Sequence, residues 1–581
     1  MTQLGFKRMA KNEKLENAID KLICKASTFE PESFAGFFAY LIKRRPKDFV
    51  DIKLNKFESK LKDFFYLIAL NAFTENKGCE PFDFSPATIG ELADLVNEIR
   101  SYYHVQNFED YTEDAAIHEM AFRNHFDNGV LSYVEQDLEK IRTVFQPFEE
   151  KIIEAFGLDI DFLIEVYKAT ELVTKIRFDQ VMEFTHTKEF NEFHAKFHSK
   201  QITFSEGIDQ LPEEVRNALL SFHAKTHAYL LFSKEDLYHT LDKDKVDKFL
   251  NLFSCKPTSL KSFRYYTENN PIELAPILEI SENKYLHICQ KQIPIAIYRR
   301  MYDFLSKDES FKDKIRRHRE KELERKVAGI FRSVFNDSSS FLYENYFVVE
   351  GHEQDLLILT KGTAIIVETK ASKLREPFRD MQRAIVRLKD DFEDSVQYGY
   401  NQCKRVENLF AGQERFDIKD EKRKVLYTVN PARFHSVFSI VVTLERFGSL
   451  QTDLNLLLKK GKTDNYPWSV YIDDLEIFLL TLKHHRRNPQ SKFLDFLRSR
   501  RQLHGHMYAI DELDVCGYYL KQPQKFKDYA QMSDTLCQFS VYEQAIFDEI
   551  YHSGGLRFKE EPMPDFHRYF SLNKPHSKAK D

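Results

Sequence analysis

The chain contains 581 residues, of which 42% are hydrophobic and 30% are charged, with a net charge of −6. This composition excludes a disordered or fibrous chain and predicts a globular protein of about two to four domains. Seven cysteines without a C-x-x-C pair exclude a disulfide framework and a zinc ribbon, and they indicate a reducing cytoplasm. No run approaches the ~18 apolar residues of a membrane span and no signal peptide precedes the first helix, so we expect a cytoplasmic protein without a membrane partner.

The N-terminal half is predicted to be almost entirely helical, because apolar residues recur at i, i+3, i+4 and i+7. The clearest stretches are Leu15–Lys25, Phe57–Phe73, Ile89–Tyr103, Val130–Phe156 and Asp161–Phe184. Prolines at Pro86 and Pro212 indicate helix starts. This half carries no catalytic constellation, and we expect it to bind a protein partner or a second copy of the chain.

Two H-x-x-x-H pairs occur in the helical half, His194 with His198 and His223 with His227. On a helix each pair shares one face and could bind a metal ion. Neither pair contains the H-E-x-x-H glutamate of a zinc protease, and ordinary helix histidines are the favoured interpretation.

A short junction follows the helical half. Pro276–Ile280 and Lys284–Ile288 flank Ser-Glu-Asn and predict a small hairpin. A helix is then expected over Ile295–Leu305, and a basic stretch leads into the next domain.

The next domain is predicted to be mixed α/β. An amphipathic helix covers Glu322–Val334, and a long helix, broken near Gly399, covers Phe378–Phe410. The apolar runs Val425–Val429 and Val437–Thr443 predict strands of a buried sheet.

Between these two helices lies a predicted β-hairpin whose loop is Lys361-Gly362. Two-residue loops fix the register, so that paired residue numbers sum to 723 and Asp355 lies directly opposite Glu368. Lys370 is two residues beyond Glu368 and therefore points to the same face.

Carboxylates facing each other across two strands repel, and burial makes the repulsion more costly. A divalent cation such as Mg²⁺ or Mn²⁺ between Asp355 and Glu368 would remove that cost and activate a water molecule, while Lys370 would assist the attack. A second interpretation uses the same register: Glu353 lies opposite Lys370, and the two could form a cross-strand salt bridge.

The pattern E-Q-D followed by I-V-E-T-K resembles the PD-(D/E)xK nuclease superfamily, in particular its restriction-endonuclease-like and nuclease-related-domain members. The resemblance covers about residues 321–444, and Gln354 stands where the family name has proline. It implies that Asp355 and Glu368 hold the metal ion and that Lys370 assists the water. It also implies a supporting glutamate on the first helix, Glu324 or secondly Glu320, and a supporting glutamine, Gln402.

Local charge points to nucleic acid as the substrate. Residues 296–332 hold twelve lysines and arginines against seven acidic residues, and residues 482–506 hold seven against one. Phosphate contacts need such patches, although the same residues also fit a solvated helix. The predicted nucleic-acid contacts are Arg316, Arg317, Arg319, Lys404, Arg405, Arg498, Arg500 and Arg501.

The C-terminal extension is predicted to contain a strand at Tyr466–Ile472 and two helices, from Asp473 to Leu482 and from Lys492 to Leu503. The cluster Asp511, Glu512 and Asp514 could hold a second metal ion, but acids at a helix start are favoured anyway.

The sequence therefore predicts a restriction-endonuclease-like mixed sheet flanked by helices and preceded by a large all-α domain. The expected activity is metal-dependent phosphodiester hydrolysis, with DNA favoured over RNA by the resemblance, in the setting of defence against foreign DNA or of DNA repair. The alternative is a non-catalytic scaffold that uses the same fold to bind nucleic acid or protein. The predicted boundaries are residues 1–270 for the helical domain, 271–320 for the junction, 321–450 for the nuclease core, 451–571 for the extension and 572–581 for a disordered tail.

Overall fold

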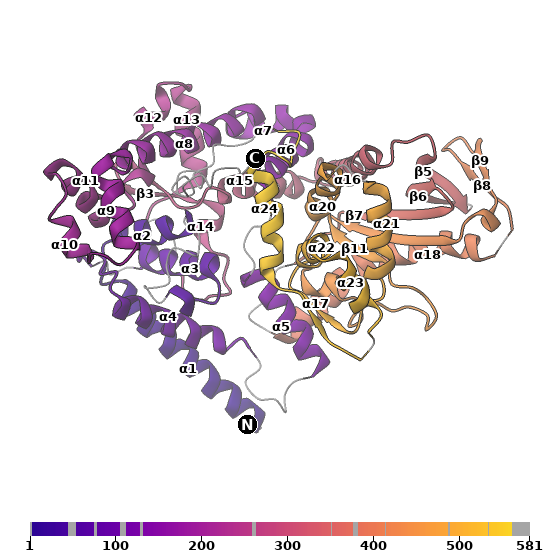
Figure 1. Cartoon of the computed structure of the whole chain (residues 1–581), viewed down its shortest axis with the longest axis horizontal. Coiled ribbons are helices and arrows are strands. Elements are labelled where there is room, and N and C mark those ends of the chain that lie inside the picture. Colours follow the sequence, from indigo (N-terminus) through magenta and orange to yellow (C-terminus); the bar gives the residue numbers. More distant parts are fainter. Residues whose placement is uncertain are drawn as a thin grey trace. The chain divides into compact units, whose positions relative to one another are not determined.

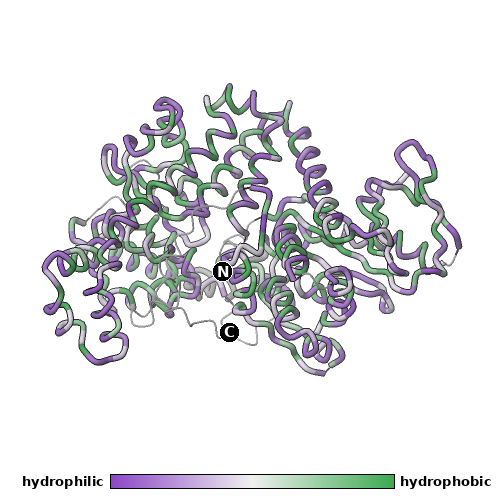
Figure 2. The backbone as a smooth tube through the Cα atoms, turned by 45° about the horizontal axis from the view of Figure 1, so that its top comes forward, coloured by the Kyte–Doolittle hydropathy of each residue, from purple (hydrophilic) through white to green (hydrophobic). Residues whose placement is uncertain are grey.

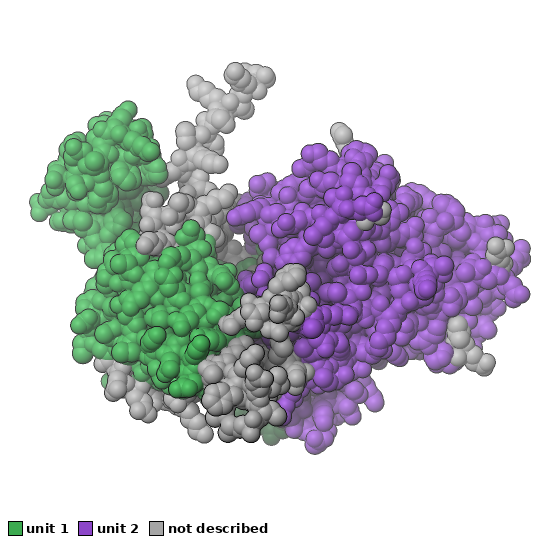
Figure 3. Space-filling view, turned by 90° about the horizontal axis from the view of Figure 1, so that it is seen from below, with its two compact units in different colours: residues 1–104, 129–304, 560–581 green, residues 105–128, 305–559 purple. Residues whose placement is uncertain are grey.

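The computed structural model divides the chain into two compact units, coloured separately in Figure 3. The helical unit comprises residues 1–104, 129–304 and 560–581, and the sheet unit comprises residues 105–128 and 305–559. The structure describes residues 3–43, 54–74, 78–104, 112–127, 132–257, 263–349, 351–375, 381–412, 414–485, 488–532 and 534–560. The predicted tail, residues 572–581, lies outside the described residues.

The helical unit confirms the prediction of a helical N-terminal half. Its helices are α1 (Gln3–Ala26), α2 (Pro31–Lys43), α3 (Lys60–Phe73), α4 (Pro86–Ser101), α6 (Val134–Phe145), α7 (Glu149–Phe156), α8 (Ile160–Val181), α9 (Lys188–His198), α10 (Phe204–Ile208), α11 (Glu213–Ala224), α12 (Lys234–Tyr238), α13 (Lys243–Phe253), α14 (Pro271–Leu274) and most of α15 (Gln292–Lys307) (Figure 1).

Local sequence explains where several of these helices begin and end. Ser85 caps α4, its side chain accepting from the Thr88 amide, and Pro86 occupies the first turn as expected. The helix predicted over Val130–Phe156 is interrupted by a 3₁₀ turn at Gln146–Phe148, because Pro147 lacks the amide that a continuous helix needs.

A small four-stranded sheet completes the helical unit, in the order β1 (Leu231–Phe232), β4 (Lys284–His287), β3 (Ile277–Ser281) and β2 (Ser254–Cys255). The predicted hairpin is confirmed as β3 and β4, which pair antiparallel. It belongs to the helical unit rather than forming a separate junction, since β1 and β2 come from earlier in the chain.

The sheet unit is built on a mixed seven-stranded sheet in which β10 runs parallel to both β7 and β11. The strands, in spatial order, are β11 (Trp468–Tyr471), β10 (Ser436–Thr443), β7 (Thr363–Lys370), β6 (His352–Thr360), β5 (Ser340–Val349), β8 (Phe416–Lys419) and β9 (Val425–Val429). Sequence analysis had not predicted β5 or β8. It was also wrong about the burial of β9, which lies at the sheet edge with four of its five residues exposed.

Helices surround this sheet. They are α5 (Glu113–Phe126), α16 (Lys312–Val334), α17 (Met381–Phe392), α18 (Tyr398–Ala411), α19 (Ser449–Thr452), α20 (Ile472–His484), α21 (Pro489–Arg500), α22 (Glu512–Lys521), α23 (Pro523–Ala530) and α24 (Ala545–His552), with a short strand pair, β12 (Met507–Tyr508) and β13 (Cys537–Gln538). A π-helical turn, Glu393–Gln397, joins α17 to α18. The break predicted near Gly399 is therefore a change of helix type two residues earlier.

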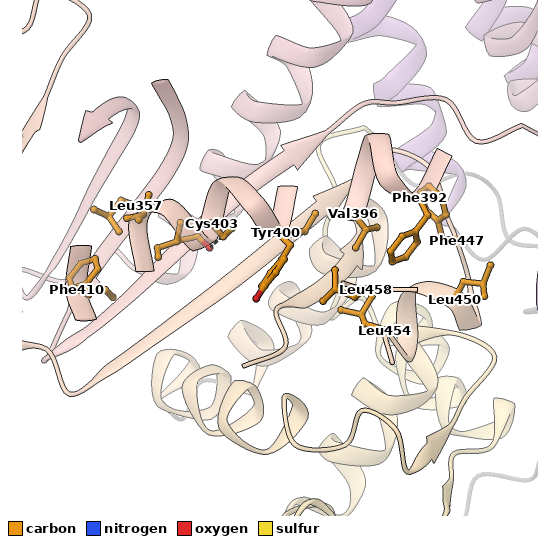
Figure 4. Close-up of a cluster of buried hydrophobic side chains, with 14 of the residues drawn as sticks. Leu357, Phe392, Val396, Tyr400, Cys403, Phe410, Phe447, Leu450, Leu454 and Leu458 are labelled. Atoms are coloured by element: carbon orange, nitrogen blue, oxygen red, sulfur yellow. Dashed lines mark hydrogen bonds between the residues drawn. The ribbon is translucent and has the colours of Figure 1, made fainter. Parts of the chain in front are cut away.

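The main core of the sheet unit lies between the sheet and α17–α18. Leu357 and Ile366 on the strands pack with Cys403 and Val406 of α18, all fully buried, and Figure 4 shows Leu357, Cys403 and Tyr400 within this cluster. Residues of opposite parity on the strands, such as Ile365, are buried as well, and α16 packs against β6 and β7. Both faces of the central strands are thus covered, as their continuous apolar runs require.

Within the described part of the chain, none of the helices combines the length and the apolar character that crossing a membrane would require.

Candidate active site

The central hairpin has the predicted register. Leu356 pairs with Val367, and the ladder continues to the pair Thr360–Thr363, so that partner numbers sum to 723. Lys361 and Gly362 both have positive φ, 44° and 72°, as a two-residue hairpin turn of this hand requires. The pairing of β6 with β7 stops at Leu356 and Val367, so the predicted pair of Asp355 with Glu368 is not part of it. Asp355, the fourth residue of β6, lies beside the end of β7.

Beyond the last backbone pair of β6 and β7, the side chain of Asp355 links the two strands. Its Oδ2 accepts hydrogen bonds from the Thr369 amide at 2.6 Å and from the Thr369 hydroxyl at 2.8 Å. Two donors on one oxygen, a backbone amide and a β-branched hydroxyl, fix the orientation of the carboxylate. Asp355 as a whole is half-buried.

Glu368 is fully buried. Burial, followed by the charge of Asp355, raises the pKa of Glu368 to about 8, and Lys370 opposes this rise. Its Oε1 makes no hydrogen bond of ordinary geometry within the described part of the chain. A buried carboxylate oxygen in this state is unusual in a folded protein and calls for a cation, a proton or water.

Lys370 is held beside these carboxylates. Its ammonium donates to the Thr369 carbonyl at 2.9 Å and lies 3.4 Å from Oε2 of Glu368. The ring of Tyr398 lies 5.4 Å from the same ammonium. The alternative pair between Glu353 and Lys370 is not among the ion pairs of the described residues, so the cross-strand salt bridge receives no support.

Glu324 on α16 belongs to the same electrostatic group. Burial, then the charges of Asp355 and Glu353, raise the pKa of Glu324 to about 7, and Lys370 lowers it. Glu320, the second choice for a supporting glutamate, is exposed one turn earlier. The charges of Asp355, Glu353 and Lys370 thus act directly on Glu324.

Gln402 on α18 is buried, and its Oε1 makes no hydrogen bond of ordinary geometry within the described ranges. The hydrogen bonds of those ranges include none from Gln402 to Asp355, Glu368 or Lys370. The supporting role of Gln402 therefore stays a prediction.

The approach of α18 to Lys370 depends on Gly399. A Cβ atom at this position would come within 2.7 Å of a Val441 methyl carbon and 3.4 Å of Cε of Lys370. The π-helical turn lies directly before this point, and such turns are frequent at functional sites. A residue without a side chain thus lets α18 pack closely against Lys370 of β7 and Val441 of β10.

Tyr346 on β5 is a site residue that sequence analysis missed. Its ring is fully buried, and burial, then the charges of Glu368, Cys403 and Asp355, raise the pKa of its hydroxyl well above the usual range. The available signal was the enrichment of FLYENYFVV in aromatic and β-branched residues, which is typical of a strand.

Two of the predicted nucleic-acid contacts are wrong, because the side chains are buried. Arg319 donates to the carbonyl of Ala371 at 2.9 Å and lies 3.3 Å from Glu445. Arg500 donates twice to Glu512, each at 2.8 Å. Both side chains lie in the interior of the sheet unit, where their guanidinium groups are paired with protein oxygens.

The other predicted nucleic-acid contacts differ in how exposed their side chains are and in whether they form ion pairs. Arg316, Arg317 and Arg498 are exposed, and Arg405 is half-buried. Lys404 forms ion pairs with Asp464 at 2.7 Å and Glu407 at 3.3 Å. The remaining residue, Arg501, lies half-buried with its guanidinium over a phenylalanine ring.

The acidic cluster before α22 is a helix cap, as favoured. Asp511 caps the helix and Asp514 completes a capping box, while Glu512 pairs with Arg500. His223 lies on α11 but His227 lies beyond its end, so these two do not share a helix face. His194 and His198 both lie on α9, with ring centroids 4.2 Å apart. Over the described ranges, no group of three or more His, Cys, Asp or Glu side chains is placed to hold a metal ion.

Comparison of the chain with models of protein families, with curated proteins and with solved structures gives no match. Function therefore has to be inferred from the chemistry of the site.

Proposed function

We propose that the sheet unit is a metal-dependent nuclease with a restriction-endonuclease-like fold, and that it hydrolyses phosphodiester bonds, with DNA as the favoured substrate. The observation that carries this proposal is the meeting of Asp355, Glu368 and Glu324 beside one anchored lysine, Lys370. Two of these carboxylates have a pKa raised to about 7 or 8, although a stable fold gains nothing from such crowding. The mixed sheet with a helix before and after the hairpin agrees with the same proposal.

The residues present fit Mg²⁺ or Mn²⁺. These hard ions keep several water molecules and use only one or two carboxylates of the protein, so Asp355 and Glu368 suffice as ligands. Among the described residues, Oε1 of Glu368 has no ordinary hydrogen bond to give up on binding. When bound, the metal ion would lower the pKa of a water molecule and compensate charge on the phosphate.

The protein side chains would divide the remaining tasks. Thr369 holds Asp355 in one orientation through its amide and hydroxyl. The Lys370 ammonium, fixed by the Thr369 carbonyl, would stabilise negative charge that develops on the phosphate oxygens. Glu324, with a pKa of about 7, can exchange a proton at neutral pH.

A cleavage assay tests the proposal directly. Purified protein is incubated with circular DNA, linear DNA and RNA, each with Mg²⁺, Mn²⁺ or EDTA. We expect cleavage of DNA that depends on Mg²⁺ or Mn²⁺ and stops with EDTA, and nicking of the circle identifies endonuclease action. Absence of cleavage on every substrate with both metals, from a folded protein, would favour the scaffold.

The exposed arginines of α16 are expected to contact phosphate. Replacing Arg316 and Arg317 together with glutamine should weaken DNA binding and reduce the slope of log affinity against log salt by up to ~0.9 per lost contact. Fluorescence anisotropy between about 50 and 200 mM salt measures the slope. The same test with Arg498 and Arg501 asks whether α21 and its end contact DNA.

Two exposed lysines of the helical unit, Lys188 and Lys256, provide the matched control, because their replacement by glutamine changes the net charge equally. An equal loss of slope in the control would mean that net charge, and not a site on α16, causes the effect. An unchanged slope for Arg316 and Arg317 would make these residues part of a solvated helix.

A further inference from the structure

Tyr398, the first residue of α18, is exposed although it lies beside the proposed active site. Its exposed fraction is 53%, and the Lys370 ammonium lies 5.4 Å from the centre of its ring. Within the described part of the chain, the Tyr398 hydroxyl makes no hydrogen bond and its ring packs on no second aromatic ring. By contrast Tyr400, two residues later, is buried and donates its hydroxyl to Asp464 at 3.2 Å. Packing of the core therefore does not explain Tyr398.

Lys370 does not depend on this ring for its position. Its ammonium donates to the Thr369 carbonyl at 2.9 Å and lies 3.4 Å from Oε2 of Glu368. A cation beside an exposed aromatic ring gains little from the contact, because water competes for the cation. The ring of Tyr398 is therefore available for a contact of its own.

The side of α18 that carries Tyr398 also carries polar side chains. Gln402 and Arg405 follow at helical spacing, so the three residues lie on one side of the helix. Tyr400 and Cys403 belong to the main core instead, as Figure 4 shows. The same alternation of hydrophilic and hydrophobic residues runs along the other helices in Figure 2. Arg405 is half-buried and forms no ion pair within the described ranges, so its guanidinium can contact a phosphate.

We infer that Tyr398 stacks on the base of an unpaired nucleotide at the proposed active site, and that the substrate class is single-stranded nucleic acid, including unpaired ends and flaps. This inference rests on the proposed function, because it takes the Lys370 ammonium as the contact of the phosphate that is cut. The ring lies close enough to that ammonium for the base of a nucleotide beside the cut phosphate to reach it. Stacking on an aromatic ring depends little on the sequence of the strand.

An intact duplex does not offer this contact. Inside a duplex each base is covered on both faces by its neighbours and is paired at its edge. Enzymes that must contact a whole base therefore act on a single strand or take the base out of the stack. A ring beside the catalytic ammonium, with a cation further along the same helix, matches the base and the backbone of an unpaired strand.

Fluorescence anisotropy in EDTA, where the proposed cleavage cannot proceed, measures the affinity for one oligonucleotide as a single strand and in a duplex. Tyr398→Leu removes the ring and keeps an apolar side chain. It should weaken single-strand binding by about five- to a hundred-fold, the usual loss for one base–aromatic stack, and leave duplex binding at the wild-type level. Tyr398→Phe and Tyr398→Trp keep a ring and should bind the single strand as the wild type does.

The matched control is Tyr542, which is 78% exposed elsewhere in the sheet unit. Tyr542→Leu should bind both forms as the wild type does. An equal loss of affinity on both forms, or a loss that Tyr398→Phe shares, would overturn the inference. So would a Tyr398→Leu variant that cleaves slowly but binds single strands normally, because the ring would then only position Lys370.

A wild-type experiment tests the same contact without any substitution in the protein. A single strand that is cut with Mg²⁺ receives one abasic nucleotide at a chosen position. We expect the wild type to cut poorly at one of the two phosphates that flank this nucleotide and normally elsewhere, and we expect the missing base to make no difference to Tyr398→Leu. A wild-type cut pattern that ignores the missing base would overturn the inference.

Failure of the proposed function and failure of this inference give different results. If no nucleic acid is cut but Tyr398→Leu still loses affinity for the single strand alone, hydrolysis is wrong and the stacking contact is supported. If DNA is cut with Mg²⁺ or Mn²⁺ but Tyr398→Leu binds single strands as tightly as the wild type, the nuclease is supported and the stacking contact is wrong.

Discussion

Lys370→Ala is expected to reduce the rate of DNA cleavage by about a hundred- to a thousand-fold, the usual effect of removing one fixed donor from a charged transition state. The wild-type ammonium is anchored by the Thr369 carbonyl and lies beside Glu368, so the substitution removes a positive charge that the fold holds in place. Metal affinity should change little at pH 9, where Glu368 is ionised in the wild type. Single-turnover cleavage and calorimetric titration with Mn²⁺ measure the two quantities separately.

Lys373→Ala is the matched control for this experiment, since Lys373 is exposed three residues further along the chain. It should cleave DNA at close to the wild-type rate. If Lys370→Ala also cleaves normally, Lys370 has no catalytic role and the assignment of the site is wrong. If the rate falls only because Mn²⁺ no longer binds, Lys370 would be part of the metal site instead.

The second prediction with a large effect is that the free energy of unfolding depends on pH through Glu368. The pKa of Glu368 is about 8 in the folded protein and near 4.5 in the unfolded chain. Between these values the folded state keeps a proton that the unfolded state has lost, so the free energy of unfolding should fall as pH rises. The slope is about 1.4 kcal/mol per pH unit for one group, which amounts to several kcal/mol across the window.

Glu368→Gln removes this titration. In EDTA we expect the variant and the wild type to have similar stability near pH 4.5, and the variant to be more stable above pH 8, by several kcal/mol. Denaturant melts at pH 5, 7 and 9 give the difference, in which contributions of other buried acids largely cancel. Glu320→Gln, at an exposed position of α16, serves as the control and should follow the wild type.

Addition of Mg²⁺ or Mn²⁺ at pH 9 should make the wild type more stable than Glu368→Gln. A ligand that binds only the folded state stabilises it by RT ln(1 + [L]/Kd), and the wild type at pH 9 presents the ionised Glu368. The variant should gain much less. A wild type that metal ions do not stabilise, together with a variant that is less stable than the wild type at pH 9, would contradict a metal site at Asp355 and Glu368.

The hairpin could be predicted from sequence because local rules determine it. The turn residues Lys361 and Gly362 define the loop, strand alternation fixes the register, and the ladder then follows by counting. β5 escaped prediction because polar residues interrupt its apolar alternation, and its place in the sheet depends on pairing with β6. Tyr346 was missed for the same reason.

The two misassigned arginines had a signal in the sequence. Arg319 lies four residues after Ile315 and four before Leu323, on the apolar stripe of α16, and all three are buried. Arg500 continues the stripe of Phe493, Phe496 and Leu497 on α21. A count of local charges alone predicts a basic surface. The helical spacing shows which basic residues lie on the apolar face of the helix and are therefore buried. The partners that make their burial tolerable, Glu445 and Glu512, come from other elements and could not be predicted from spacing.

One helix of the sheet unit has a consequence for biosynthesis. Ile117 and Ala121 of α5 are buried in the main core of that unit, where α5 packs against α17 and α19. Yet about 250 residues separate the end of α5 from the start of α17. At translation speeds of about 5 to 20 residues per second, α5 waits on the order of 10 to 50 s for the first of these partners to leave the ribosome. A protein that starts at residue 305 would lack α5 altogether and leave that part of the core open, so expression of the sheet unit alone requires residues 105–128 to be supplied as well.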